Sequence, residues 1–549
     1  MTPELKIGLA QCNPVIGDLD GNLAAILQRL EMAEKQGVDL LIFPELSLTG
    51  YPPRDLLFEE GFVSRQLAAL EKVETACRRV AVFLGFVEPN NEPSGRPFFN
   101  SLAVVHEGKR IATYRKRLLP YYDVFDEPRY FEPGSSPTIV EIKKKKIGLA
   151  ICEDVWNETG FLNRLYGTHP MADLEKAGLD LLVVPSASPF HLLKHQARER
   201  LLLHVSQRLR APVAFCNQVG GNDELLFDGC SALVGNGKVL AAGPAFEEAL
   251  VVASLPTVSE DRPVYPKSDA EWLLGALELG VRDYVRKCRA SNVVVGVSGG
   301  IDSAVVVALA VRALGKEHVY ALSLPTRFTS SGSKSDARVL CEKLGVSFKE
   351  LSIEPLFEKY RGLWPEWFGH PLEEVALENI QPRIRMTLLM ALANEKGALL
   401  LNTSNKSEIS TGYATLYGDS AGALSVLGDL TKDQVYALAR ALNDHGMQIP
   451  EGILNRAPSA ELRENQADSD SLPDYETLDA LVEQRVVQAR AGGQSDRNAE
   501  ALFSRLYAAS EFKRAQLPPF CGSAAKRLVR AGAFPLRSVN ARAEPYATT

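Results

Sequence analysis

One short segment, SGGIDS at residues 298–303, combines glycines, hydroxyls and a carboxylate in a way that suits an anion. It lies between the apolar runs NVVVGV and AVVVALAV, so a strand, a glycine turn and a helix are expected. Glycines let the backbone approach a phosphate without a Cβ clash, and the N-terminus of the following helix offers free N–H groups. Ser298 and Ser303 add hydroxyl donors. Because the lysine of the common P-loop is absent, we predict a phosphate or pyrophosphate site of another kind.

A cysteine is the second candidate for chemistry. Cys152 lies in GLAICEDVW, at 148–156, directly after a short apolar run. A thiol becomes a strong nucleophile when a base or a nearby cation favours its thiolate. The chain has eight cysteines and no C-x-x-C pair, so the common zinc and redox patterns are not indicated. We expect most of the other cysteines, Cys12 among them, to be small buried hydrophobic residues.

The size and charge of the chain limit the kinds of protein it can be. With 549 residues it is too long for one hydrophobic core, so at least two domains are expected. The formal net charge of −7 argues against nucleic-acid binding through a broad basic surface. No apolar run approaches the length of a membrane span, and the segment MTPELKIGLAQC has no secretory pattern. A cytoplasmic location is therefore expected, with neither nucleic acid nor membrane as a partner.

The first half of the chain contains an internal repeat. KIGLAQC at 6–12 recurs as KIGLAIC at 146–152, and EKQGVDLLIFPE at 34–45 recurs as EKAGLDLLVVPS at 175–186. The two pairs are separated by 140 and 141 residues and keep their order. We predict two similar βα units whose sheets pack face to face, giving an α-β-β-α sandwich over residues 1–255. Equivalent strand ends would bring Cys12, Glu45, Cys152 and Ser186 to the same ends of the two sheets.

A proline-rich segment, residues 256–270, is expected to link this domain to a second one at 271–549. Buried strands such as YALSLP and ALLLNTS alternate there with helical patterns, which predicts a doubly wound parallel sheet. The region from about residue 460 onward is polar and rich in turn residues, so we expect it to be rich in loops.

VGVSGGIDS resembles the pyrophosphate loop of the N-type ATP pyrophosphatases, and four later segments narrow the resemblance to NAD synthetases. These segments are ENIQPRIRMTLLMALAN (378–394), NTSNKSEISTGYATLYGD (402–419), LTKDQVYALAR (430–440) and LRENQADSDSLPDYETLD (462–479). The resemblance implies that a substrate carboxylate attacks the α-phosphate of ATP and that pyrophosphate leaves.

Matching these motifs position by position implies a set of ligand-binding residues. ATP would be bound by Gly296, Val297, Ser298, Gly299, Gly300, Ile301, Asp302, Ser303, Arg385, Thr403 and Lys432. Deamido-NAD would be bound by Asn379, Arg383, Glu408, Asp419 and Lys513, although the stretch after Lys513 departs from the family pattern. Asp302 and Glu408 match the carboxylates of a magnesium site, and oxygen ligands suit Mg²⁺.

The first half resembles the nitrilase-type amidohydrolases, which have a duplicated α-β-β-α fold and a Glu-Lys-Cys triad. Three segments carry the resemblance, in the family's order: FPELSLTGYPPRDLL (43–57), YRKRLLPYYDVFDEPRYFEPG (114–134) and GLAICEDVW (148–156). It implies that Glu45 is the base, Lys116 helps to hold the oxyanion and Cys152 is the nucleophile. Four further residues are matched to orienting or binding the substrate glutamine: Tyr122, Glu127, Ser188 and Lys194.

Together the two resemblances imply an amidotransferase that uses ammonia from glutamine and ATP to convert deamido-NAD to NAD, and that forms a homo-oligomer. A related amidotransferase acting on another carboxylate is an alternative, but the nitrilase-like half and ENIQPRIRM argue against it. A nucleotide-binding protein without activity is a second alternative. A protein without activity is disfavoured because the chain keeps all five candidate catalytic and metal-binding residues: Glu45, Lys116, Cys152, Asp302 and Glu408.

Overall fold

The structure is a computed structural model that describes residues 5–162, 166–255, 263–488 and 497–519. The chain divides into two compact units, one holding nearly all described residues up to Pro266 and the other beginning at Lys267. The division falls inside the segment expected to be a linker. Within the described ranges, none of the helices combines the length and the apolar character that a membrane crossing requires.

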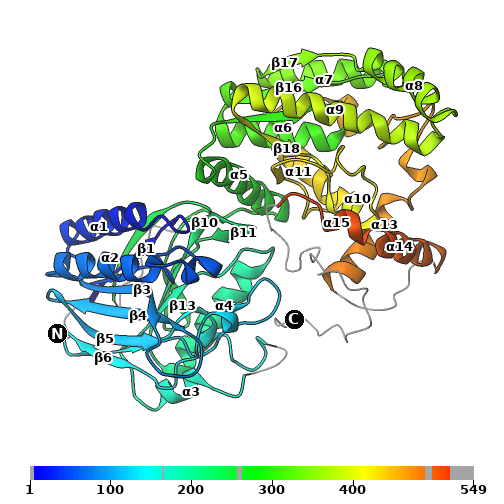
Figure 1. The fold of residues 1–549 in the computed structure, drawn as a ribbon. Helices are drawn as coiled ribbons and strands as arrows, with labels where there is room; N and C mark the ends of the chain where they lie inside the picture. The colour runs from blue at the N-terminus through cyan, green and yellow to red at the C-terminus, as the bar shows by residue number, and fades with distance from the viewer. Residues whose placement is uncertain (1–4, 163–165, 256–262, 489–496, 520–549) are drawn as a thin grey trace. The chain divides into compact units, whose positions relative to one another are not determined.

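The first unit contains two six-stranded sheets (Figure 1). In the first sheet the order is β14 (Ala249–Leu255), β1 (Leu5–Gln11), β2 (Leu40–Ile42), β3 (Ala81–Pro89), β4 (Phe98–His106) and β5 (Lys109–Arg115). In the second it is β6 (Ile139–Ile142), β7 (Lys145–Leu149), β8 (Leu181–Ser186), β9 (Val213–Asn217), β12 (Ala232–Gly235) and β13 (Lys238–Ala242).

Both sheets repeat one pairing pattern, as the internal repeat predicts. In the strand order given for each sheet, the first and second strands pair antiparallel. The next two pairs of neighbouring strands are parallel, and the last two pairs are antiparallel. The recurring KIGLA segments form β1 and β7, and the recurring DLL segments form β2 and β8. The parallel strands β2 and β8 therefore end at equivalent places in the two sheets.

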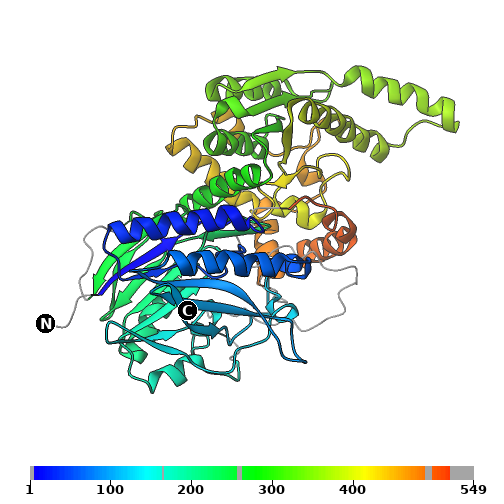
Figure 2. The ribbon, with the colours of Figure 1, turned by 60° about the vertical axis from the view of Figure 1, so that its left-hand side comes forward.

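The sheets pack face to face, and helices cover their outer faces. Ile7 and Leu9 of β1 share a buried cluster with Ile147 and Leu149 of β7, which is the core between the sheets. On the outer face of the first sheet lie α1 (Leu19–Lys35) and α2 (Phe62–Ala76), side by side in Figures 1 and 2. The second sheet is covered by α3 (Pro170–Glu175) and α4 (Lys194–Leu209). The predicted α-β-β-α sandwich is confirmed.

The second unit is built on a five-stranded, all-parallel sheet. Its order is β17 (Ser347–Glu350), β16 (Val319–Ser323), β15 (Asn292–Gly296), β18 (Ala398–Asn402) and β19 (Leu424–Ser425). The chain runs outward from β15 to β17 and then returns to the other side of β15 as β18. Such a reversal leaves a crevice at the carboxyl ends of the two strands, where ligands bind in open α/β sheets.

Helices flank this sheet in two groups (Figure 1). One group is α5 (Asp269–Lys287), α6 (Ile301–Leu314) and α11 (Lys432–Asp444), with α6 against β15 and β16. The other contains α9 (Glu374–Lys396), which packs on β15 and β18, and α8 (Glu354–Phe368), which lies beside α9 (Figures 1 and 2). The remaining long crossover helix is α7 (Ser331–Leu344). The doubly wound parallel domain is the one predicted.

The expectation of a loop-rich C-terminal region is wrong for much of the part that the structure describes. It forms α13 (Tyr475–Val482), α14 (Arg497–Ala509) and α15 (Glu511–Arg514). Ala499, Phe503, Leu506 and Tyr507 recur at helical spacing and pack with α13, but the turn-rich stretches that flank them dominated the sequence signal. The last part of the region lies outside the described residues.

Candidate active sites

The three residues predicted to form the triad lie at the ends of strands in the first unit. Glu45 follows β2, Lys116 directly follows β5, and Cys152 begins the short 3₁₀ turn η3 (Cys152–Val155) after β7. All three side chains are buried. Lys116 Nζ donates to Glu45 Oε1 and to Glu127 Oε1, each at 2.7 Å. The structure therefore brings together the predicted base, the predicted cation and the second predicted glutamate.

Glu45 is held by two further donors that the sequence did not indicate. Asn100 Nδ2 donates to Glu45 Oε1 at 2.7 Å, and the Ala187 N–H donates to Glu45 Oε2 at 3.0 Å. Asn100 also accepts the Lys116 N–H through its backbone oxygen at 2.8 Å. A polar residue in the apolar strand FFNSLAVV was the available signal for Asn100. Both oxygens of the predicted base are thus fixed in direction.

Cys152 is buried among the charges of Glu45, Glu127 and Lys116, and its backbone has a positive φ, as that of the buried Cys230 also has. The φ of Cys152, +43°, lies in the left-handed region, which costs a non-glycine residue about 1–3 kcal/mol and is found at functional sites. Burial and the charge of Glu45 raise the pKa of the Cys152 thiol well above its usual range, against the opposing effect of Lys116. The thiol is therefore protonated in the free site, and attack requires a base to take its proton.

The equivalent cysteine of the other repeat serves as an internal comparison. Cys12 follows β1 as Cys152 follows β7, and burial raises its pKa to about 12. The described cysteines Cys77, Cys216, Cys230 and Cys341 are also buried, as expected, whereas Cys288 is exposed, contrary to the expectation. Cys521 lies outside the described residues. Among the cysteines that the structure describes, only Cys152 has the charges of Glu45, Glu127 and Lys116 acting on its thiol.

Glu127 gives a first prediction. Burial raises the pKa of Glu127 to about 7, with Lys116 opposing and Glu45 adding to the shift, and Tyr51 donates to it at 2.9 Å. Replacing Glu127 with glutamine removes the second carboxylate that orients the lysine, so kcat for glutamine hydrolysis should fall by about 10- to 100-fold. Release of glutamate from glutamine measures this.

The matched control for that change is Glu88→Gln. Glu88 pairs with Arg115, the last residue of β5, at 2.7 Å, next to Lys116 in the chain but partly exposed. A surface pair of this kind contributes little. If Glu88→Gln lowers kcat as much as Glu127→Gln does, the contact between Glu127 and Lys116 has no special role.

Two of the residues matched to glutamine binding, Tyr122 and Lys194, interact with Glu153, which none of the sequence predictions includes. Tyr122 Oη donates to the two oxygens of Glu153 at 2.9 and 3.0 Å, and Tyr166 Oη donates to it at 2.9 Å. Lys194, at the start of α4, lies 5.7 Å from the ring centre of Trp156 and interacts electrostatically with Glu153. A buried carboxylate and a buried lysine that interact electrostatically suit the amino and carboxylate groups of an amino acid.

Ser188 is the fourth residue of that predicted set. It is buried after β8, and its N–H donates to Asn217 Oδ1 at 2.9 Å. Asn217 in turn donates to Asp228 Oδ1 at 3.2 Å, and Asp228 interacts with Lys194. Ser188 is thus connected to the lysine through a buried polar network. Glu153 directly follows Cys152 in the segment GLAICEDVW, and this position was the signal in the sequence that could have indicated it.

Lys194 gives a prediction about pH. Burial lowers the pKa of Lys194 to about 8. A lysine binds a carboxylate while it is protonated, that is, below its pKa, so KM for glutamine should rise as the pH increases through about 8. Lys194→Arg keeps the charge to higher pH, and its KM should stay constant over the same range. A KM that rises equally in both proteins would contradict this role for Lys194.

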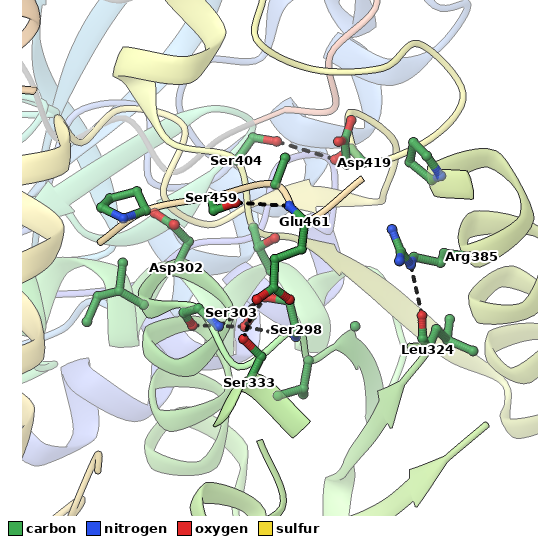
Figure 3. A pocket seen from close by; sticks show the side chains of 18 of the residues that line it. Ser298, Asp302, Ser303, Leu324, Ser333, Arg385, Ser404, Asp419, Ser459 and Glu461 are labelled. Atoms are coloured by element: carbon green, nitrogen blue, oxygen red, sulfur yellow. Dashed lines mark hydrogen bonds between the residues drawn. The ribbon is translucent and has the colours of Figure 1, made fainter. Parts of the chain in front are cut away.

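In the second unit, a pocket lies at the carboxyl ends of β15 and β18 (Figure 3). It is lined by Gly296, Val297, Ser298, Gly300, Ile301, Asp302, Ser303, Arg385, Thr403, Glu408, Asp419 and Lys432. Every predicted ATP-binding residue except Gly299 is in this set. The pocket occupies the strand-order reversal, which is where the topology predicts a ligand.

The geometry of SGGIDS explains its glycines. Gly299 has φ +87°, and a Cβ there would lie 2.2 Å from the backbone oxygen of Ser333, so another residue would not fit. Ser298 Oγ accepts the Gly300 N–H at 3.1 Å, and Ser303 Oγ donates to the Gly300 oxygen at 3.1 Å. Helix α6 begins at the next residue, Ile301. The turn therefore aims the helix N-terminus into the pocket, which suits a phosphate.

The two carboxylates predicted to hold a metal both lie beside the ammonium group of one lysine side chain. Lys432 Nζ lies 2.6 Å from Asp302 Oδ2 and 3.3 Å from Glu408 Oε1. Burial and the charge of Asp302 raise the pKa of Glu408 to about 8, against the effect of Lys432. Asn405 donates to Asp302 Oδ1 at 2.9 Å. Two carboxylates this close favour a positive charge between or beside them.

The residues matched to deamido-NAD surround one loop, Gly412–Asp419. Asn379 Oδ1 accepts from Thr415 Oγ1 at 2.7 Å, and Asp419 Oδ1 accepts the Thr415 N–H at 2.6 Å. Arg383 donates to the Leu416 oxygen at 3.2 Å, and Lys513 donates to the Gly412 and Ala414 oxygens. Of these, only Asp419 and Glu408 line the pocket itself.

The segment at residues 456–461 supplies pocket residues that lie outside the motifs found in the sequence. Arg456 donates to the Gly299 oxygen at 3.2 Å and to Ser333 Oγ at 2.9 Å, and Ser333 Oγ donates to Glu461 at 2.8 Å. Figure 3 shows Ser333 and Glu461 beside Ser298 and Ser303, with Ser459 accepting the Glu461 N–H. No motif marks these residues; only the fold brings them to the SGGIDS turn.

Comparison with known proteins agrees with this division of the chain. The family model described as carbon-nitrogen hydrolase matches residues 6–262, and the one described as NAD synthase matches residues 273–517. A glutamine-dependent NAD(+) synthetase from Synechocystis sp. is 40% identical over 531 residues, covering 93% of this chain and 95% of the relative. One from Thermotoga maritima is 38% identical, covering 87% and 88%.

Solved structures give the same result. The glutamine-dependent NAD+ synthetase of Acinetobacter baumannii, in complex with ADP, has a TM-score of 0.76 and 33% identity, with 96% of each chain covered. The enzyme from Cytophaga hutchinsonii has a TM-score of 0.81 at 23% identity over 96% of each chain, which shows the shared fold. The fold and the two sites thus define an amidotransferase in which a carbon-nitrogen hydrolase domain precedes an ATP-using ligase domain. The chain belongs to the family of glutamine-dependent NAD(+) synthetases.

Proposed function

We propose that this enzyme converts deamido-NAD to NAD, with ATP activating the carboxylate and glutamine supplying the nitrogen. The products are NAD, AMP, pyrophosphate and glutamate. The observation that carries the proposal is the Glu45–Lys116–Glu127 arrangement beside Cys152. In a family that pairs the two domains, an intact set of this kind indicates a working glutaminase rather than a degenerate one.

In the glutaminase half, Glu45 takes the proton of the Cys152 thiol as sulfur attacks the side-chain amide carbon of glutamine. Lys116, buried between Glu45 and Glu127, stabilises the oxyanion that forms. The C–N bond then breaks as Glu45 gives that proton to the leaving NH₂ group, which departs as ammonia. Water, deprotonated by Glu45, attacks the resulting thioester, and glutamate leaves with the thiol restored. Tyr122, Glu153, Ser188 and Lys194 form the pocket for the amino-acid end.

In the synthetase half, the SGGIDS turn and the N-terminus of α6 bind the phosphates of ATP, with Arg385, Thr403 and Lys432 around them. Asn379, Arg383, Asp419 and Lys513 shape the loop that receives deamido-NAD. The deamido-NAD carboxylate attacks the α-phosphate, and pyrophosphate leaves. Ammonia then attacks the adenylate, and AMP leaves with the amide formed. Lys432 neutralises charge as pyrophosphate departs.

We propose Mg²⁺ as the metal of this reaction, held by Asp302 and Glu408. Among the described residues no group of three or more histidine, cysteine, aspartate or glutamate side chains could hold a metal. A pair of carboxylates suits Mg²⁺, which usually completes its shell with substrate phosphates and water. The raised pKa of Glu408 supports the fit, because it reflects the nearby charge of Asp302 and its own burial. Bound Mg²⁺ would neutralise the negative charge of the phosphates.

A homo-oligomer is a further part of the proposal. Helix α8 leaves large apolar side chains exposed, including Leu356, Tyr360, Trp367 and Phe368. Exposed apolar groups gathered on one element are typical of protein interfaces. A cytoplasmic location stays a prediction from the sequence.

The experiment that tests the proposed function is a product balance. Purified protein with deamido-NAD, ATP, Mg²⁺ and glutamine should form NAD, AMP and pyrophosphate in equal amounts, and at least as much glutamate. AMP formation that requires deamido-NAD, and ceases when another nucleotide carboxylate replaces it, supports the assigned substrate. Equal turnover of a different carboxylate in its absence would favour the related amidotransferase instead.

A further inference from the structure

Asp154, two residues after the nucleophile, is fully buried and accepts four hydrogen bonds. Its Oδ2 accepts the Ile151 N–H at 2.9 Å and the Tyr114 hydroxyl at 2.8 Å. Its Oδ1 accepts the N–H groups of Arg117 and Leu118 at 3.1 and 2.9 Å. Both oxygens of this carboxylate are thus engaged by donors from two separate segments of the chain.

These donors flank the two residues that must act on one substrate carbonyl. Ile151 immediately precedes Cys152, and it belongs to the turn after β7 in the second sheet. Tyr114 and Arg117 lie on either side of Lys116, at the end of β5 in the first sheet. The Asp154 side chain therefore joins the ends of the two sheets at the point where the nucleophile and the cation meet.

The backbone conformation of Cys152 indicates what the hydrogen bonds of Asp154 do. Cys152 is held at φ +43°, a conformation that a non-glycine residue keeps only when its surroundings enforce it. The hydrogen bond from Ile151 N–H to Asp154 closes the turn around that residue. A carboxylate suits the position because it is acceptor-only at both oxygens, whereas an amide would present an NH₂ group to N–H donors.

We propose that Asp154 is a positioning residue of the glutaminase, whose carboxylate holds the Cys152 turn and the Lys116 strand end in a fixed relation. The proposal rests on the proposed glutaminase function. Asp154 acts through Cys152 and Lys116 and makes no contact with the reacting atoms. Displacement of a reacting group by about 1 Å can lower a rate about 100-fold. The loss should therefore appear in the chemical step.

The test compares Asp154→Ala and Tyr114→Phe in the full-length enzyme. Asp154→Ala should lower kcat for glutamine hydrolysis by about 100-fold while KM changes by less than about threefold. Tyr114→Phe removes one of the four donors and leaves the ring in place, so it should lower kcat by about three- to tenfold. NAD formation supported by ammonium should be unchanged in both, because it bypasses this site.

Asp180→Ala is the matched control. Asp180 Oδ2 accepts the Lys146 N–H at 2.9 Å, so its carboxylate also joins backbone segments, but at the other end of β7. This variant should keep the wild-type kcat. A merely structural role for Asp154 would lower thermal stability alone, and kcat of the folded fraction would not change.

Each possible result of these experiments either supports or overturns the proposal. Wild-type kcat in folded Asp154→Ala, or an equal loss in Asp180→Ala, would overturn the proposal. Where Asp154→Ala does not fold, Tyr114→Phe decides: a lowered kcat at constant KM supports the positioning role, and an unchanged kcat overturns it. A wild-type enzyme that hydrolyses no glutamine would overturn the proposed function itself, and the positioning role with it.

Discussion

Cys152→Ala is expected to lower NAD formation from glutamine by about 10⁴-fold or more, while NAD formation from ammonium stays near the wild-type rate. The thiol is the atom that forms the thioester, and no neighbouring group can replace it. Its protonated state in the free site makes the reaction depend on Glu45, so Glu45→Gln should give a loss of similar size. Rates of NAD formation with each nitrogen source, measured on the same preparation, test this.

The internal repeat provides the control for that experiment. Cys12 lies at the equivalent strand end and is equally buried, but its thiol does not have the charges of Lys116 and Glu45 beside it. Cys12→Ala should therefore keep glutamine-dependent activity, at most with a small loss of stability. If instead Cys12→Ala loses the activity and Cys152→Ala keeps it, the assignment of the nucleophile within the duplicated fold is wrong.

Asp302→Asn is expected to lower NAD formation by about 10³-fold with either nitrogen source, while glutamine hydrolysis continues. Asp302 is one of two carboxylates around Lys432, at 2.6 Å from its Nζ, and it lines the nucleotide pocket. Its loss leaves Glu408 alone beside the lysine and removes one proposed ligand of Mg²⁺. The loss of a single group that stabilises charge at a reaction centre typically lowers kcat by about 10²–10³-fold.

The control here is Asp433→Asn, one residue after the lysine. Asp433 is exposed in the first turn of α11, so its substitution should leave both rates unchanged. Glutamate release and NAD formation, followed in parallel, distinguish a synthetase defect from general damage. Asp302→Asn with a wild-type rate of NAD formation would remove Asp302 from the reaction and with it the proposed metal site.

Much of the fold could be predicted because the repeat and the periodicities are local signals. The recurrence of KIGLA and DLL segments at one separation specified two equivalent sheets, and the structure has the same strand pairing in both. The α14 helix was missed because its apolar residues lie between turn-rich stretches. A short amphipathic pattern carries less weight than its flanks when only the sequence is read.

The candidate sites also contain some residues that the sequence could predict and others that it could not. Glu45, Lys116 and Cys152 could be predicted because each lies in a motif, and the contacts of Lys116 are those the chemistry requires. Asn100 and Arg456 lie outside these motifs, and each contributes through a tertiary contact with a segment far away in the chain. The roles assigned to Asn379, Arg383 and Lys513 remain predictions, since these residues surround the loop rather than line the pocket.

The most direct test of the central claim follows the nitrogen atom. Purified enzyme is given deamido-NAD, ATP, Mg²⁺ and glutamine labelled with ¹⁵N in its side-chain amide, and the NAD formed is analysed by mass spectrometry. The account predicts that the carboxamide of NAD carries ¹⁵N, with one AMP released for each NAD. NAD without the label, or labelled glutamine converted to glutamate with no NAD formed, would contradict it.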